Sequence, residues 1–154
     1  MDKKLPLIWS IAAVDNLAAA GVIADTQWAA STAVHCATIV TGITAQNSKT
    51  FLSSHPTEIS LLDAQWLALI EQGIPEAIKI GAILSNKQLD WLINRLLKLK
   101  SKHAGLKIIF DPVIYSSSEK TIAEETLSKD LLLKLISLAD LITPNVDEAI
   151  SLTE

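Results

Sequence analysis

The chain alternates between short runs of apolar, β-branched residues and longer segments in which apolar residues recur at helical spacing. The apolar runs predict five strands, at residues 7–12, 38–44, 77–81, 106–110 and 139–142. The helical spacing predicts helices, at residues 22–33, 61–72, 86–102, 128–138 and 146–152. Residues 54–57 are interpreted as a loop. Strands that alternate with helices favour right-handed crossovers, so we expect an α/β fold with a mostly parallel, doubly wound sheet and helices on both faces.

The fourth predicted strand ends abruptly at Asp111 and Pro112. Leu106, Ile108, Ile109 and Phe110 are typical of a strand that is buried on both faces. Ligands of open α/β sheets bind in the crevice outside the carboxyl ends of the strands. Asp111 is therefore the first candidate for chemistry.

Polar or small residues follow the other predicted strands as well. They are Asp15 and Asn16, Gln46 and Asn47, Gly81, and Thr143 with Asn145. Each of these residues alone could simply form a turn after its strand. Parallel strands nevertheless place all of these ends on one rim of the sheet, which predicts a shared site there.

Length and charge limit the functional classes. The 154 residues fit one domain, taken as residues 1–154, and 13 basic against 17 acidic residues give a net charge of −4, which argues against nucleic acid as a partner. The single cysteine, Cys36, excludes an internal disulfide and fits a reducing, cytoplasmic compartment. The first apolar run is too short to span a membrane.

Several motifs carry a family resemblance. AAVDNLAAAGVIAD, TGITAQNS, AIKIGAI, FDPV and ADLITPNVDEA occur in this order along the chain. Together they resemble the N-terminal part of the hydroxymethylpyrimidine/phosphomethylpyrimidine kinases of thiamine biosynthesis, which have a ribokinase-like fold. The resemblance implies phosphoryl transfer from ATP, with Mg²⁺, to 4-amino-5-hydroxymethyl-2-methylpyrimidine and then to its monophosphate.

The resemblance also implies roles for individual residues. Gln46 matches a glutamine whose amide hydrogen-bonds the aminopyrimidine, and Asp25 matches a carboxylate of the same pocket. Gly81 allows the chain to pass close to the ring, and Val113 matches a residue that packs on it. Asp111 and Asn145 match the side that faces magnesium and the nucleotide phosphates. No metal site built from protein ligands alone is expected.

The sequence departs from the family pattern in three places. Asp15 is followed by an alanine-rich segment that keeps only Gly21, where the family has a glycine-rich run. Residues 114–118 lack the lysine that usually follows the DPV motif. The glycine-rich anion hole and the general base of the family would lie beyond Glu154. We therefore expect a truncated ribokinase-like domain that is incomplete as a catalyst alone.

Two alternatives to a complete kinase remain open. One is a non-catalytic module that binds a pyrimidine or another protein, and the other is the first part of a longer or interrupted gene. A truncated doubly wound sheet leaves a strand edge uncovered, which favours a homo-oligomer or a partner chain over that edge.

Other reactive or aromatic residues receive structural interpretations. His35, His55 and His103 lack metal-ligand spacing, and Cys36 is expected to be a buried, inert thiol. Trp28, Trp66 and Trp91 lie on helical apolar stripes and are interpreted as core or interface anchors.

Overall fold

The computed structural model describes residues 5–113, 123 and 125–153. Six strands and five helices follow one another along this part of the chain. In order they are β1 (Leu7–Asp15), α1 (Gly21–Ser31), β2 (His35–Gln46), β3 (Phe51–Pro56), α2 (Ile59–Gln72), β4 (Ala77–Ile80), α3 (Asn86–Lys102), β5 (Lys107–Phe110), α4 (Lys129–Leu138), β6 (Leu141–Ile142) and α5 (Val146–Thr153).

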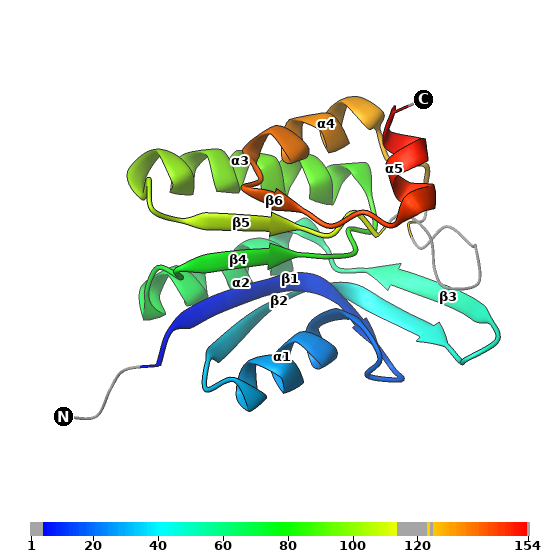
Figure 1. Cartoon of the computed structure of the whole chain (residues 1–154), viewed down its shortest axis with the longest axis horizontal. Coiled ribbons are helices and arrows are strands. Elements are labelled where there is room, and N and C mark those ends of the chain that lie inside the picture. The colour runs from blue at the N-terminus through cyan, green and yellow to red at the C-terminus, as the bar shows by residue number, and fades with distance from the viewer. Residues whose placement is uncertain (1–4, 114–122, 124, 154) are drawn as a thin grey trace.

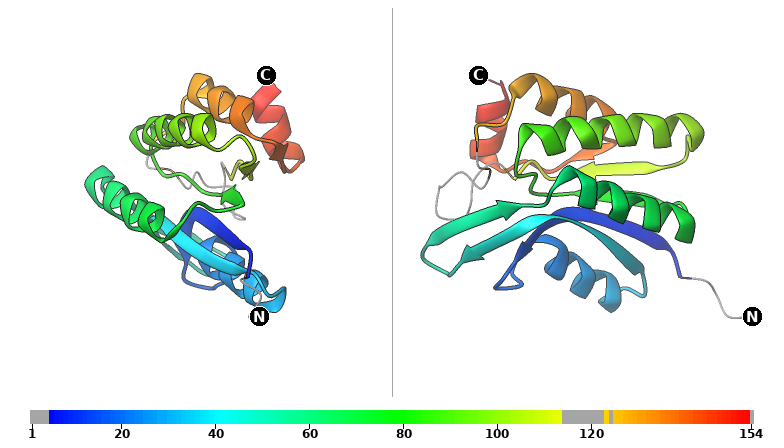
Figure 2. Two further views of the ribbon diagram at one scale, coloured as in Figure 1. Left: turned by 90° about the vertical axis from the view of Figure 1, so that its left-hand side faces the viewer. Right: turned by 180° about the vertical axis from the view of Figure 1, so that it is seen from behind.

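The six strands form one twisted sheet in the order β3-β2-β1-β4-β5-β6. All neighbouring pairs are parallel except β2 and β3, which are antiparallel. Helix α1 lies on one face, and α2, α3 and α4 lie on the other (Figures 1 and 2). The predicted doubly wound α/β sheet with helices on both faces is therefore confirmed.

The main core lies between the sheet and the helices α2 and α3. Trp9 of β1 and Trp66 of α2 meet edge to face, with ring centroids 5.3 Å apart, and Trp66 meets Trp91 of α3 in the same way at 5.9 Å. Such aromatic pairs contribute about 0.5–1.5 kcal/mol each beyond their area burial. Alternate residues of β4, Ile78 and Ile80, also point into this core and are fully buried. Lys79 between them therefore points to the opposite face, toward α1.

One expectation about local structure was wrong. The segment interpreted as a loop at residues 54–57 lies mostly in β3, which pairs Ser54 with Thr44 and His55 with Ile43. This edge strand pairs with β2, and its two large apolar residues, Phe51 and Leu52, are adjacent rather than alternating, so hydrophobic periodicity did not reveal it. Of the three tryptophans interpreted as core or interface anchors, Trp66 and Trp91 pack in the core, whereas Trp28 is 74% exposed, so its interpretation as an interface anchor stays a prediction.

No helix in the described part of the chain is long and apolar enough to span a bilayer.

Candidate functional site

The turn that leaves β1 is organised by the carboxylate of Asp15. Its two oxygens accept hydrogen bonds from the backbone N–H groups of Leu17, Ala19 and Ala20, at 3.0–3.1 Å. Burial of Asp15 opposes ionisation and is the largest single effect on the pKa, but these donors and the Gln46 amide together outweigh it and lower the pKa. The ionised carboxylate of Asp15 thus fixes the backbone of the alanine-rich loop.

The loop adopts a conformation that alanine disfavours. Ala18 has a φ of 57°, in the left-handed region, where a Cβ costs roughly 1–2 kcal/mol. Gly21, with a φ of 63°, starts α1, and a methyl group there would lie 2.1 Å from the carbonyl oxygen of Ala13. The one glycine that the sequence retains therefore stands where no side chain fits.

Gln46 ends β2 beside this loop. Its backbone N–H donates to Oδ1 of Asn16 at 2.9 Å, and Nδ2 of Asn16 donates back to the Gln46 carbonyl oxygen at 2.9 Å. The Gln46 side chain also hydrogen-bonds Asp15. These contacts fix both the backbone and the terminal amide of Gln46 at the carboxyl edge of the sheet.

Lys79 connects two carboxylates that lie far apart in sequence. Its Nζ lies 3.1 Å from Oδ2 of Asp25, on α1, and 3.9 Å from Oδ2 of Asp111, directly after β5. Oδ2 of Asp25 also accepts a hydrogen bond from the hydroxyl group of buried Ser10 at 2.5 Å. Helix α1 is thereby tied to the sheet at the point where Asp25 faces Lys79.

These groups surround one cavity of about 300 Å³ at the carboxyl edge of the sheet. Five of the six predicted site residues line it, namely Asp25, Gln46, Gly81, Asp111 and Val113. The cavity wall also includes Asp15, which the strand-end pattern placed on this rim, together with Lys79 and Trp28, which the sequence did not indicate. Among the described residues that line this cavity, Lys79 is the only one with a basic side chain.

Asn145, the sixth predicted site residue, does not line this cavity. It caps α5: Oδ1 accepts the backbone N–H of Glu148 at 2.9 Å, and the Glu148 carboxylate accepts the backbone N–H of Asn145 at 2.9 Å. This reciprocal pair is a capping box. The pattern Asn-x-x-Glu before a helix was visible in the sequence and indicates this structural role.

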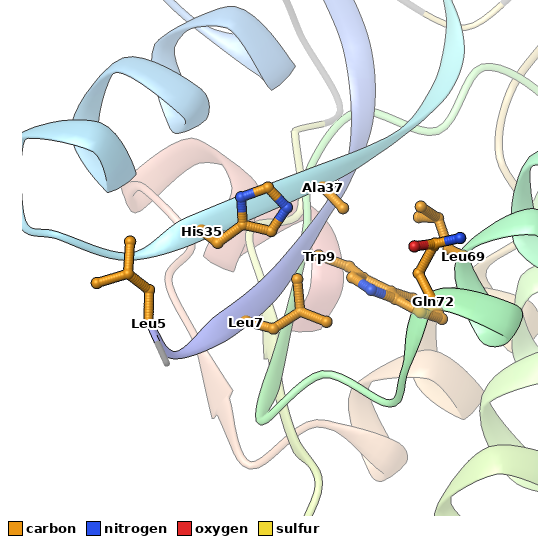
Figure 3. A pocket seen from close by; sticks show the side chains of 7 residues that line it. All are labelled: Leu5, Leu7, Trp9, His35, Ala37, Leu69 and Gln72. Atoms are coloured by element: carbon orange, nitrogen blue, oxygen red, sulfur yellow. The ribbon is translucent and has the colours of Figure 1, made fainter. Parts of the chain in front are cut away.

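A second cavity, of about 360 Å³, lies at the opposite end of the sheet. Figure 3 shows its wall, formed mainly by apolar side chains from the amino-terminal ends of β1 and β2 and the end of α2; the residues are Leu5, Leu7, Trp9, His35, Ala37, Leu69 and Gln72. It contains no carboxylate and none of the predicted site residues. The cavity at the carboxyl edge therefore offers the charged and amide groups that oriented binding of a polar ligand requires.

The histidines and Cys36 do not form a metal site or a reactive thiol site in the described part of the chain. No group of three or more His, Cys, Asp or Glu residues in the described ranges is arranged to hold a metal ion. Cys36 is partly buried, and burial together with the nearby Asp25 carboxylate raises the pKa of its thiol. A raised pKa favours the neutral, unreactive thiol, as expected from the sequence.

Comparisons with known proteins indicate the family and the fold of the chain. The family model of phosphomethylpyrimidine kinase matches residues 15–154. Hydroxymethylpyrimidine/phosphomethylpyrimidine kinase from Staphylococcus aureus is 29% identical over 144 residues, which are 94% of this chain and 51% of that enzyme. The crystal structure of phosphomethylpyrimidine kinase from Clostridium difficile superimposes with a TM-score of 0.83 and 29% identity, covering 96% of this chain and 62% of that one.

A third comparison concerns the fold alone. Pyridoxal kinase from Staphylococcus aureus, solved in complex with AMP-PCP, has a TM-score of 0.75 and 23% identity. The chain thus spans about half the length of the curated kinase it matches, and 62% of the solved one. The match of the family model over most of the sequence, with the same fold in a solved member, shows that the chain belongs to the phosphomethylpyrimidine kinase family.

Proposed function

We propose that the cavity at the carboxyl edge binds 4-amino-5-hydroxymethyl-2-methylpyrimidine and its monophosphate, and that the chain contributes this site to an ATP-dependent kinase of thiamine biosynthesis. The observation that carries the proposal is the convergence of Asp25, Gln46, Gly81, Asp111 and Val113 on one cavity. Asp111 and Val113 both follow β5, and the other three come from separate parts of the fold, so sequence spacing alone does not bring the five together. We place this activity in the cytoplasm, a reducing compartment, because the sequence has a single cysteine and so no internal disulfide.

The ring end of the proposed site combines an amide, a carboxylate and an apolar wall. The Gln46 amide has one donor engaged with Asp15, so its carbonyl oxygen and second N–H remain for a ring that presents paired donors and acceptors. Oδ2 of Asp25 is engaged by Ser10 and Lys79, and Oδ1 is left to accept the exocyclic amino group. Val113 supplies apolar contact. A methyl group at Gly81 would lie 3.3 Å from Nζ of Lys79, on the cavity wall, so the absence of a side chain there leaves room.

The phosphate end of the proposed site contains Asp111. Mg²⁺ in phosphoryl-transfer enzymes is usually held by one or two carboxylates together with substrate phosphates and water. The single half-buried carboxylate of Asp111 fits that arrangement, because phosphates and water supply the other ligands. Among the described residues there is no cluster that would hold the ion by protein ligands alone. When bound with ATP, Mg²⁺ neutralises charge on the phosphates; Asp111 would orient the ion, and Gln46 with Asp25 would hold the hydroxymethyl group in place.

Equilibrium binding tests this proposal. Calorimetric titration of the purified chain with the hydroxymethylpyrimidine should give a saturable one-site isotherm. Gln46→Leu should weaken binding by about tenfold, because it removes the paired hydrogen bonds of the amide and leaves ring donors unmatched. Gln27→Leu, an exposed position on α1 outside the cavity, should bind like the unaltered chain. Absence of saturable binding, or equal binding by Gln46→Leu, would contradict the proposal.

A further inference from the structure

Lys79 lines the proposed site, although it has no role in the function argued above beyond holding Asp25. Its side chain is 27% exposed and lies between carboxylates from two different elements, one on α1 and one after β5. The two contacts are unequal. Nζ makes a hydrogen bond with Asp25 at 3.1 Å, whereas its 3.9 Å separation from Asp111 is an ion pair without a hydrogen bond.

The backbone directs Lys79 to this place. Ile78 and Ile80 occupy the core face of β4, so the period of two in a strand turns Lys79 to the α1 face. In register, Lys79 lies beside Ser10 of β1 on one side and Ile109 of β5 on the other. Ser10 donates to the same oxygen of Asp25, so two neighbouring strands anchor one carboxylate.

We propose that Lys79 is a positioning residue that acts in opposite senses on the two ends of the site. It fixes Asp25, so that the free Oδ1 is presented to the ring of the pyrimidine. It also places a positive charge 3.9 Å from Asp111, which lowers the affinity of that carboxylate for a divalent cation. The inference rests on the proposed function, because it concerns the same cavity.

The two effects can be separated by substitution. Lys79→Met keeps the length of the side chain and removes its charge. It should weaken pyrimidine binding by about tenfold, because Asp25 loses a charge-assisted hydrogen bond that orients it. The same substitution should strengthen cation binding at Asp111 by about threefold to tenfold, because a nearby like charge is removed. If the substitution instead disrupted the local structure, it would weaken both pyrimidine binding and cation binding.

Ser10→Ala is the matched comparison at the ring end. Ser10 contacts Asp25 and not Asp111, so this variant should weaken pyrimidine binding and leave cation binding unchanged. Lys107→Met serves as a control for removing a strand lysine, since Lys107 pairs with Asp140 away from the cavity. It should change neither affinity.

The experiment measures both affinities in the whole chain. Pyrimidine binding is followed by calorimetry, and cation binding by the Mn²⁺ concentration that half-broadens the backbone NMR signals of Asp111 and Val113. Opposite shifts in Lys79→Met, with Lys79→Arg close to the unaltered chain for cation binding, support the inference. Shifts in the same direction, or no shift, overturn it. Failure of the unaltered chain to bind the pyrimidine would contradict the proposed function, whereas binding that Lys79→Met leaves intact would contradict only the role of Lys79.

Discussion

Asn16 and Gln46, thirty residues apart in sequence, are joined by a reciprocal pair of hydrogen bonds between the side chain of one and the backbone of the other. Asn16 belongs to the loop after β1, and Gln46 is the last residue of β2. The pair therefore fixes the position of Gln46 relative to Asp15, which bonds its amide. Gln46, which we propose to hydrogen-bond the pyrimidine, is therefore held at its backbone by Asn16 and at its side chain by Asp15.

Asn16→Ala should lower the free energy of unfolding and also weaken ligand binding. Two exposed hydrogen bonds are lost, which corresponds to about 1 kcal/mol. Pyrimidine affinity should fall by roughly threefold, because Gln46 would be less ordered before binding. Urea unfolding and calorimetry measure the two quantities. Asn94→Ala removes an exposed asparagine of α3 that also makes two hydrogen bonds, so equal loss of ligand affinity in that control would argue against the role of Asn16.

Ala18→Gly should stabilise the chain. Ala18 has a φ of 57°, and glycine adopts this conformation without the steric cost of a Cβ. The gain should be about 0.5–1 kcal/mol, because relief of strain is partly offset by the larger entropy of glycine in the unfolded chain. Thermal and urea unfolding measure it. Ala30→Gly, at an exposed position in α1, should instead destabilise the chain by about 1 kcal/mol. A loss of stability in Ala18→Gly would show that the loop is not strained there.

Acid should destabilise the protein partly through Asp140. The backbone N–H of Ile108, followed by the Lys100 and Lys107 ammonium groups, lowers the pKa of Asp140 to about 2. An unfolded aspartate titrates near pH 3.9, so the folded state binds the proton less readily. The resulting stabilisation is present above about pH 4 and is lost as the pH falls toward 2.

Asp140→Asn should therefore be less stable at pH 6 and should lose less stability between pH 4 and 2 than the unaltered chain. Asp15 and Asp63 also have lowered pKa values, so part of the acid dependence should remain. Urea unfolding at a series of pH values measures the slope. An unchanged slope in Asp140→Asn would contradict the assignment.

The sequence predicted the sheet and part of the cavity wall for a common physical reason. Buried parallel strands have strong apolar runs, and their carboxyl ends share one edge, so Gln46, Gly81 and Asp111 could be expected together. Asp25 and Val113 came from the family resemblance, since a position on a helix or after a strand does not by itself indicate a ligand contact. The polar edge strand β3 lacked the apolar period and was missed.

Lys79 and Trp28 show what the sequence could not provide. The alternation in β4 indicates which face Lys79 occupies, but its pairing with Asp25 depends on where α1 packs. Trp28 lies on a helix rich in apolar residues, and only the packing of α1 reveals that this side chain stays exposed beside the cavity. For Asn145 the capping box explains its local position, and the role on the magnesium side that the family resemblance implies stays a prediction.

The most direct test of the account is to map the bound pyrimidine on the chain by backbone and side-chain amide NMR. Addition of 4-amino-5-hydroxymethyl-2-methylpyrimidine should shift the Gln46 side-chain amide and the backbone signals of Gly81 and Val113, in a saturable way. Signals beside the second cavity, such as those of Ala37 and Gln72 (Figure 3), should stay unchanged. Saturable shifts confined to Ala37 and Gln72, or none at Gln46, would contradict the claim that the carboxyl edge of the sheet holds the pyrimidine site.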